Sequence, residues 1–419
     1  MYLATTGRRS DAPSRPAGTG RRVPGTVIAL GTVSLVTDVS SEMVTAVLPL
    51  YLVLGLGLSP LQFGFLDGLF NGATALVRLL GGRLADHGGG RHRTVAGVGY
   101  LLSALSRLGL LLADGAAGGI AAALAADRLG KGVRTAPRDA LISLSAPPES
   151  LGRAFGVHRA MDTTGALLGP LVAFAVLWAT ADAYDAVFAV SFATGLFGVL
   201  VLVLFVPAGT EPAAGTAAVA AAGSRPTGRR RNRALGDPVF RRVVTAAALL
   251  GAATIGDSFL YLLLQRGLDL PPLIFPLLPL GAAAGYLLLA VPAGRIADRT
   301  GRRIPFLCGH VALLAAYLTL MAPPGWPAAV LVLVLLAVFY AATDGVLMAL
   351  AGPVLPLDGR ASGLALLQTG QALARLVGAA GFGAAWTWCG PRPALAVAAL
   401  ALAAALVAAW RILPEREVS

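Results

Sequence analysis

The sequence predicts an all-α membrane protein that crosses the bilayer many times and is built from two similar halves. Of its 419 residues, 56% are hydrophobic and only 13% are charged, and the mean hydropathy is +0.75. A soluble domain carries about twice that share of charged residues. Apolar runs of about 20 residues, the length of a helix that crosses a bilayer, recur from end to end. A basic loop pattern also occurs twice, about half a chain apart, which indicates that two similar segments are joined head to tail.

Twelve apolar runs are expected to cross the membrane as helices, six in each half. The expected spans are residues 26–54, 61–81, 94–113, 117–144, 153–178, 184–206, 242–265, 271–292, 304–322, 327–352, 361–387 and 391–411. Paired arginines precede the first run, but no small-residue cleavage site follows a short apolar core. The first run is therefore interpreted as a retained span rather than a secretion signal.

The placement of arginine predicts how the spans are oriented. The formal net charge is +12, and the arginines collect in the N-terminal tail, after the second span, in the middle of the chain and after the eighth span. All of these segments lie on one side if the spans alternate, whereas the opposite loops hold little beyond Arg266 and Arg392. The positive-inside rule then makes both termini cytoplasmic in a bacterial inner (plasma) membrane, and the basic balance indicates topology rather than nucleic-acid binding.

A polar segment in the middle of the chain is expected to be a linker between two six-helix bundles. It is rich in Ala, Gly and Pro and then basic, a composition too polar to span a membrane. The expected organisation is a cytoplasmic tail at 1–25, an N-terminal bundle at 26–206, a cytoplasmic linker at 207–241, a C-terminal bundle at 242–412 and a second tail at 413–419. Transporters are commonly built from such halves, which move about a central site.

The repeated loops carry a family resemblance. The sequence GGRLADHGGGRHR at Gly81–Arg93 returns as PAGRIADRTGRR at Pro292–Arg303. Both resemble the Gly-x-Leu-Ala-Asp-Arg-x-Gly-Arg-Arg loop of the major facilitator superfamily, which joins spans two and three and has a counterpart between spans eight and nine. The second copy follows the motif closely, whereas the first has His87 in place of arginine and Gly90 displaces its basic cluster. The resemblance implies twelve spans in two six-helix bundles related by pseudo-two-fold symmetry.

The resemblance also implies a gating role for these loops when the cytoplasmic side is shut. Their acids would then bridge to arginines and helix ends of neighbouring spans, where a helix N-terminus favours an acid by roughly 0.3–1 kcal/mol. The residues expected to take part are Gly82, Asp86, Arg91, Arg153, Gly294, Asp298, Arg299, Gly301, Arg302, Arg303 and Arg360.

Charged residues inside the expected fourth span need partners or a function, since an intramembrane charge costs at least a few kcal/mol. Asp127, Lys131, Arg134 and Arg138 stand at i, i+4, i+7 and i+11, on one face of a helix. The first span offers an acidic face, and the fifth adds a histidine and an acid one turn apart. In the superfamily, the first and fourth helices of each half are expected to line the central cavity. The residues assigned to the cavity and to proton coupling are Asp38, Glu42, Asp127, Arg128, Lys131, Arg134, His158 and Asp162.

Two short motifs favour proton-coupled export. We expect Asp38 or Glu42 to bind and release the coupling proton, because their environment changes as the cavity opens. Arg128 and Gly132 resemble the Arg-x-x-x-Gly motif that the superfamily associates with proton coupling. The stretch Gly165-Ala-Leu-Leu-Gly169-Pro170 resembles the antiporter motif of proton-coupled exporters. The chain also looks like a group of bacterial permeases that share its TDVSSEM and RLGKGVRTAPRDAL segments, although that group indicates no substrate.

The second half offers isolated polar residues as substrate candidates. Its residues in this class are Asp257, Asp344, Gln368, Gln371 and Arg375. Packing within the bundle is the competing interpretation. Arg78 and Arg107, near the second and third spans, are expected to face the cavity or to extend toward the membrane surface.

The function predicted from these observations is secondary active transport of a small solute by alternating access, with proton-coupled efflux favoured. Proton-coupled uptake is one alternative, and a divalent metal or metal chelate as cargo is another, since the intramembrane acids and His158 are possible ligand types. A non-transporting receptor is less favoured. The sequence contains no metalloprotease, dithiol or phosphate-loop motif that would indicate an enzyme. We expect no cofactor, no resident metal and no nucleic-acid partner, only the bilayer, the solute and protons, and a monomeric protein.

Overall fold

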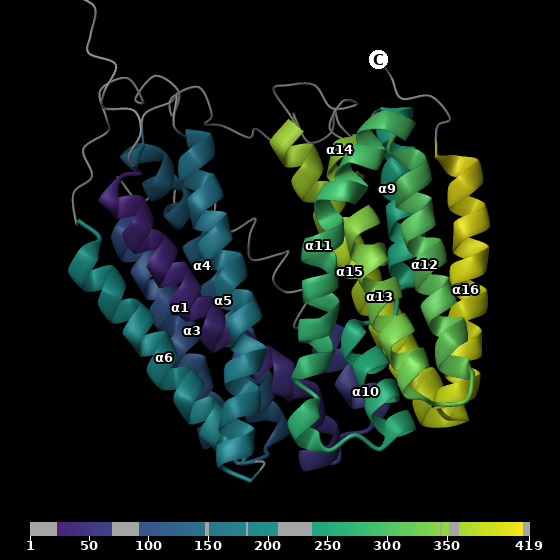
Figure 1. Cartoon of the computed structure of the whole chain (residues 1–419), viewed down its shortest axis with the longest axis horizontal. Helices are drawn as coiled ribbons and strands as arrows, with labels where there is room; N and C mark the ends of the chain where they lie inside the picture. Colours follow the sequence, from purple (N-terminus) through teal and green to yellow (C-terminus); the bar gives the residue numbers. More distant parts are fainter. Residues whose placement is uncertain are drawn as a thin grey trace, which may run out of the picture.

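The computed structural model describes residues 23–68, 92–146, 151–181, 183–207, 237–343, 346–351 and 360–413. All regular secondary structure in these ranges is helical. The helices of the first half lie on the left of Figure 1 and those of the second half on the right. The two groups meet at the lower end of this view and lie apart toward the upper end, where the C-terminus is. We call the side on which α1 begins and α16 ends the terminal side.

The first half contains six helical segments. They are α1 (Gly25–Leu50), which continues as the π-helical turn η1 (Tyr51–Gly55), residues 60–68, α3 (His92–Leu112), α4 (Ala117–Ser145), α5 (Leu151–Ala179) and α6 (Tyr184–Phe205). Small residues bring these helices together, as small residues do in membrane bundles. A Cβ atom added at Gly130 of α4 would lie 2.5 Å from Ser103 Oγ and 2.6 Å from the Gly99 carbonyl oxygen of α3. Close packing of α3 on α4 therefore depends on glycine at this crossing.

The second half repeats this plan with more interruptions. Its elements are α9 (Pro238–Ala252), α10 (Asp257–Leu268), the 3₁₀ turn η3 (Pro272–Ile274), α11 (Leu277–Thr300), α12 (Arg303–Met321), α13 (Trp326–Thr343), α14 (Val346–Ala351), α15 (Arg360–Cys389) and α16 (Pro391–Ile412). Gly301 joins α11 to α12 at a φ of +81°, a left-handed conformation that glycine adopts without strain.

The expected seventh span is not one continuous helix. It begins at Pro238, ahead of residue 242, because Asp237 caps it by accepting hydrogen bonds from the Val239 and Phe240 amides. It then breaks at residues 253–256, between α9 and α10. The break is stable inside the membrane because its backbone finds another partner: the Ile255 N–H donates to the Tyr317 hydroxyl at 2.8 Å.

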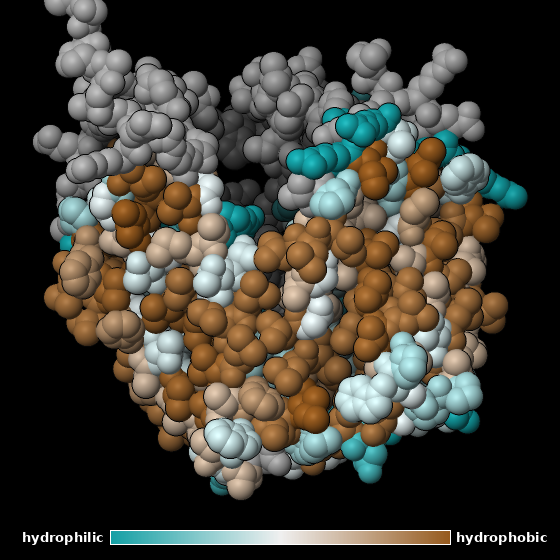
Figure 2. All heavy atoms as spheres, in the orientation of Figure 1, coloured by the Kyte–Doolittle hydropathy of each residue, from teal (hydrophilic) through white to brown (hydrophobic). Residues whose placement is uncertain are grey.

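The outer surface of the bundle suits a lipid environment. Within the described residues, nine helical segments are long and apolar enough to cross a membrane. Figure 2 shows hydrophobic residues over most of the lateral face, with hydrophilic residues gathered toward its ends. Helix α4 is not among the nine, because it carries several charged residues along its length. This arrangement confirms the all-α polytopic fold that the composition predicts.

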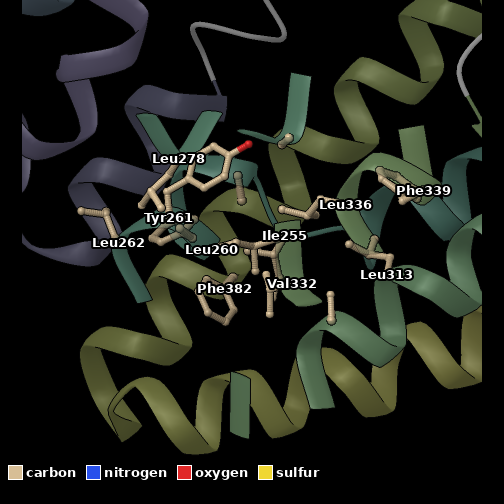
Figure 3. Packing of buried hydrophobic residues seen from close by; sticks show 14 of the residues in the cluster. Ile255, Leu260, Tyr261, Leu262, Leu278, Leu313, Val332, Leu336, Phe339 and Phe382 are labelled. Atoms are coloured by element: carbon tan, nitrogen blue, oxygen red, sulfur yellow. The ribbon is translucent and has the colours of Figure 1, made fainter. Parts of the chain in front are cut away.

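The larger hydrophobic core fills the second half and extends into the first. In Figure 3, Leu260 of α10, Leu313 of α12, Leu336 of α13 and Phe382 of α15 all point into the same packed region. Leu260, Leu313 and Leu336 are fully buried. A packed core of this kind fixes the positions of the helices in the second half, so the side chains that these helices contribute to a ligand site are held in place.

Candidate substrate cavity and charge cluster

A cavity of about 800 Å³ lies between the two halves. The first half contributes walls from α1, residues 60–68, α4 and α5, and the second half contributes α11, α13, α15 and the break between α9 and α10. Pockets that bind small molecules typically have volumes of about 300–1,000 Å³. The cavity is therefore large enough for a small organic solute and is bordered by both halves, as a site for alternating access requires.

Eight of the residues singled out from the sequence line this cavity. They are Glu42, Arg128, Lys131, Pro170, Asp257, Gln368, Gln371 and Arg375. The remaining members of the predicted charge cluster, which are Asp38, Asp127, Arg134, His158 and Asp162, lie behind the wall. Asp344 lies outside the described residues. The stripe on α4 thus divides into a part that meets the cavity and a part that packs against other helices.

The acids of α1 pair with the bases of α4 at two levels. Glu42 Oε1 lies 3.9 Å from Lys131 Nζ at the cavity wall, where both side chains are about a quarter exposed. Deeper in the bundle, Asp38 Oδ1 accepts a hydrogen bond from Arg134 at 3.4 Å. The Arg134 guanidinium also stacks over the Tyr100 ring of α3, with its Cζ 4.6 Å from the ring centroid. Each helix thereby neutralises charge that the other could not hold in lipid.

Asp127 is held by two arginines and does not reach the cavity. Its carboxylate pairs with Arg128 and lies 2.7 Å from Arg107 Nη1. Arg107 is itself buried and donates a second hydrogen bond to Ser41 of α1 at 2.8 Å. The expectation that Arg107 faces the cavity or extends to the membrane surface is wrong. Asp127 supplies a buried counter-charge for Arg107, so the Arg107 side chain stays among α1, α3 and α4.

A third group of charges joins α4 to α5. Arg138 lies 3.0 Å from Asp139 and 3.7 Å from Asp162, and Asp162 also pairs with Arg159 at 3.3 Å. His158 is only 4% exposed, and within the described residues neither of its ring nitrogens has a hydrogen-bond partner. In the same part of the chain, no group of three or more His, Cys, Asp or Glu side chains is arranged to hold a metal ion.

The glycines of the predicted antiporter motif form the contact between α5 and α1. A Cβ atom at Gly165 would overlap the Leu35 carbonyl oxygen, and one at Gly169 would lie 2.5 Å from Glu42 Cβ. Pro170 follows inside α5 and lines the cavity. The motif therefore places α5 directly beside the helix that carries Asp38 and Glu42.

A carboxylate of the first half that the sequence analysis did not single out lies at the boundary between the halves. Asp67, in the helical segment 60–68, lines the cavity and accepts a hydrogen bond from Ser258 of α10 at 3.0 Å. Asp257, the residue before Ser258, accepts one from the Tyr340 hydroxyl of α13. A lone acid inside the expected second span was the available signal for Asp67, because such acids are usually functional in membranes.

The two halves are sealed together on the side opposite the termini. The Phe63 and Phe259 rings meet edge to face with centroids 4.9 Å apart, and Phe259 meets Phe382 of α15 in the same way at 4.9 Å. The Leu61 N–H donates to Thr387 Oγ1 of α15 at 3.0 Å. We call this contact surface, made by residues 60–68, α10 and the last turns of α15, the seam. It closes one end of the cavity with packed aromatic rings.

The predicted gating residues are only partly described. Gly82, Asp86 and Arg91 lie outside the described residues, and the side chains of Arg153, Asp298 and Arg360 are likewise not described. In the second loop, Gly294 and Arg299 lie near the end of α11, and Gly301 and Arg302 connect it to α12. Arg303 stacks over the Trp410 ring of α16 at 4.6 Å and donates to its carbonyl oxygen. The contact of Arg303 thus lies within the second half.

Comparison with curated sequences identifies relatives over part of the chain. An uncharacterised MFS-type transporter of Methanocaldococcus jannaschii is 39% identical over 149 residues, which cover 36% of each chain. An uncharacterised protein of Mycobacterium tuberculosis is 34% identical over 163 residues, which cover 38% of each chain. The matched segments therefore span well under half the length of these relatives.

Comparison with solved structures shows the same fold over nearly the whole chain. The nucleoside transporter NupG superposes with a TM-score of 0.75 at 14% identity, covering 93% of this chain and 98% of that one. A bacterial homologue of the human lysosomal transporter Spinster, in an inward-facing and unoccupied conformation, gives a TM-score of 0.68 at 16% identity, covering 93% and 94%. At these identities the likeness concerns the fold alone.

The family model described as Major Facilitator Superfamily matches residues 30–285 and 258–419. Its two matches together span almost all of the two helical halves that border the cavity. The twelve-span resemblance carried by the repeated loops is thus confirmed at the level of the superfamily. With its polytopic helical fold and its cavity between the halves, the chain belongs to the major facilitator superfamily and is a multi-pass membrane protein.

Proposed function

We propose that the chain exports a small solute in exchange for protons, with Glu42 and Asp38 as the groups that carry the coupling proton. The observation that carries this proposal is the Glu42–Lys131 pair in the cavity wall. At 3.9 Å it is a loose ion pair, and one partner comes from α1 and the other from α4. A movement of either helix, or the arrival of a solute, can separate the two charges and change the affinity of Glu42 for a proton.

Asp38 connects the Glu42–Lys131 pair to the interior of the first half. It lies one helical turn before Glu42 and bonds to Arg134, which is three residues after Lys131 on α4. The Gly165 and Gly169 contacts keep α5 against the same stretch of α1. Proton binding at this level therefore acts on three helices that pack together. Asp127 is held between Arg107 and Arg128, so we assign it a structural role in the proposal.

The distribution of arginine supports cytoplasmic termini in a bacterial plasma membrane. The terminal side carries the larger set of described arginines, namely Arg93, Arg241, Arg242, Arg295, Arg299, Arg302, Arg303 and Arg411. The opposite side carries Arg266 and Arg392. With this orientation the seam is the extracytoplasmic gate in its closed state, and the cavity is approached from the cytoplasm. The antiporter motif favours efflux from this state. We propose that the transporter acts as a monomer.

The test is transport in proteoliposomes that contain a pH-sensitive dye, screened against organic cations, organic acids, sugars, siderophores and divalent metals. We expect one solute class to move protons in the opposite direction across the membrane. Glu42→Gln or Asp38→Asn should leave solute exchange intact and abolish its dependence on the pH gradient. Asp185→Asn, an exposed change at the start of α6, is the matched control.

Three outcomes would contradict this proposal. Normal pH-driven flux in both variants would exclude the two acids as coupling groups. Proton movement in the same direction as the solute would favour uptake. Proton movement on addition of a divalent metal or its chelate would make that class the cargo.

A further inference from the structure

Arg375 differs from the other charged residues of the cavity wall in its contacts with the described residues. Glu42 pairs with Lys131, Arg128 pairs with Asp127, and Asp257 accepts from Tyr340. In the described part of the chain, the Arg375 guanidinium forms no hydrogen bond and no ion pair. Its Nε atom is buried and has no hydrogen-bond partner. The side chain projects from the middle of α15 and lines the cavity.

A guanidinium that forms no hydrogen bond with the described residues can donate to the oxygen atoms of a ligand in the cavity. Arginine keeps its proton at any physiological pH, so it cannot become neutral to avoid the cost of desolvation. Its planar fork of N–H groups matches the oxygen atoms of a carboxylate or a phosphate. Arginine at membrane depth commonly marks the path of a substrate when no protein group neutralises it. A binding role for Arg375 follows from the same considerations.

Two further donors lie in the same wall. Gln371 is one helical turn before Arg375 on α15, so the two side chains share a face of that helix. Tyr261 of α10 lines the cavity from the neighbouring helix. Within the described residues, neither the Gln371 amide nor the Tyr261 hydroxyl is in a hydrogen bond with another side chain or the backbone. The wall therefore presents hydrogen-bond donors in addition to Arg375.

An acid close to this group of donors narrows the class of solute. Asp257 lies within electrostatic range of Arg375 and is bonded to the Tyr340 hydroxyl. Its negative charge disfavours a solute with several anionic groups at this position. It also offers an acceptor for a hydroxyl or amino group that lies beside the anionic group.

We propose that Arg375, with Gln371 as a second donor, binds the anionic group of the transported solute, and that the solute is a small organic acid or phosphate ester with a neighbouring hydrogen-bond donor. The proposal rests on the assignment of the cavity to transport. It does not depend on proton coupling or on the direction of transport.

The experiment measures the melting temperature of the purified full-length protein in detergent. Wild type, Arg375→Gln and Arg375→Lys are each titrated with lactate, glycerol phosphate and inorganic phosphate, and with the neutral analogues lactamide and glycerol. Comparison of lactate with glycerol phosphate distinguishes carboxylate from phosphate recognition. Arg392→Gln is the control, because this arginine is exposed at the start of α16 and lies outside the cavity.

We expect a saturable rise in the melting temperature of wild type and Arg392→Gln with at least one organic anion, and none with its neutral analogue. Arg375→Gln should bind that anion about 10- to 100-fold more weakly, as expected for the loss of hydrogen bonds to a charged group. Arg375→Lys should retain part of the affinity.

The proposal would be overturned by the absence of an anion-dependent shift in wild type, or by a shift that Arg375→Gln reproduces in full. Loss of proton coupling in the Glu42 and Asp38 variants is measured separately, in proteoliposomes. A failure of that proposal is thus distinguishable from a failure of this one.

Discussion

The carboxylate of Asp127 lies between Arg107 and Arg128, deep in the contact of α3 with α4. A buried ion pair is a weak source of net stability, but removal of one partner leaves the other charge uncompensated. The first half contains ion pairs at several levels, and they join α4 to α1, to α3 and to α5. At the scale of single residues, the charges of α4 therefore divide into those that hold helices together and those that the cavity can use.

Arg107→Met is expected to destabilise the protein strongly. The change removes a buried guanidinium that bonds to both Asp127 and Ser41, and the expected loss is about 3–5 kcal/mol. Arg159→Gln is the matched control, because the Arg159 side chain is 79% exposed where it pairs with Asp162. Its removal should cost less than about 1 kcal/mol. Unfolding in detergent, followed by tryptophan fluorescence, would show equal stabilities for the two variants if Arg107 were dispensable.

At the scale of elements, the sequence predicted where helices lie better than how they are interrupted. Hydropathy located the seventh span, but the break at residues 253–256 depends on the Tyr317 hydroxyl, which comes from α12 and satisfies the Ile255 N–H. A contact between residues this far apart in the chain has no local signal. Glycine patterns were more informative, since Gly165 and Gly169 occupy the crossing of α5 with α1.

Gly165→Ala is expected to impair packing of α5 on α1. The added methyl group would overlap the Leu35 carbonyl oxygen, and overpacking of this kind typically costs about 1–3 kcal/mol. Gly156→Ala, on the same helix, has open space around the new Cβ atom and serves as the control. The melting temperature and the initial transport rate should fall for Gly165→Ala and stay at the wild-type values for Gly156→Ala. A wild-type melting temperature and transport rate in Gly165→Ala would show that α5 and α1 accommodate the added methyl group without loss of stability.

At the scale of the whole molecule, the two halves meet at the seam and border one cavity. The seam combines aromatic packing, the Leu61–Thr387 hydrogen bond and the Asp67–Ser258 hydrogen bond. These interactions must be broken each time the seam opens, so their summed strength biases the equilibrium between the closed and open conformations of the seam. Asp67 belongs both to the seam and to the cavity wall, so a solute that binds in the cavity next to Asp67 can affect the stability of the seam.

Phe63→Ala is expected to shift the protein toward the state in which the seam is open. Loss of the edge-to-face contact with Phe259 removes about 0.5–1.5 kcal/mol beyond the buried area, and each 1.4 kcal/mol changes the ratio of two states about tenfold. Spin labels at Ser59 and Trp388, in a background without the native cysteines, would report a longer distance across the seam. Phe65→Ala is the control, since Phe65 lies on the same helix and is exposed. An unchanged distance distribution in Phe63→Ala would contradict a gating role for the aromatic contact.

The sequence by itself determined the all-helical membrane fold, the membership of the superfamily and the pairing of an acidic α1 with a basic α4. These properties follow from hydropathy, from the repeated loops and from helical spacing, which are local or periodic. Only the tertiary structure decided which charges reach the cavity, that Arg107 neutralises Asp127, that Asp67 meets Ser258 at the seam, and that Arg375 forms no hydrogen bond with the described residues. The physical reason is that a charge in a membrane is defined by what surrounds it, and its neighbours come from helices far apart in the chain.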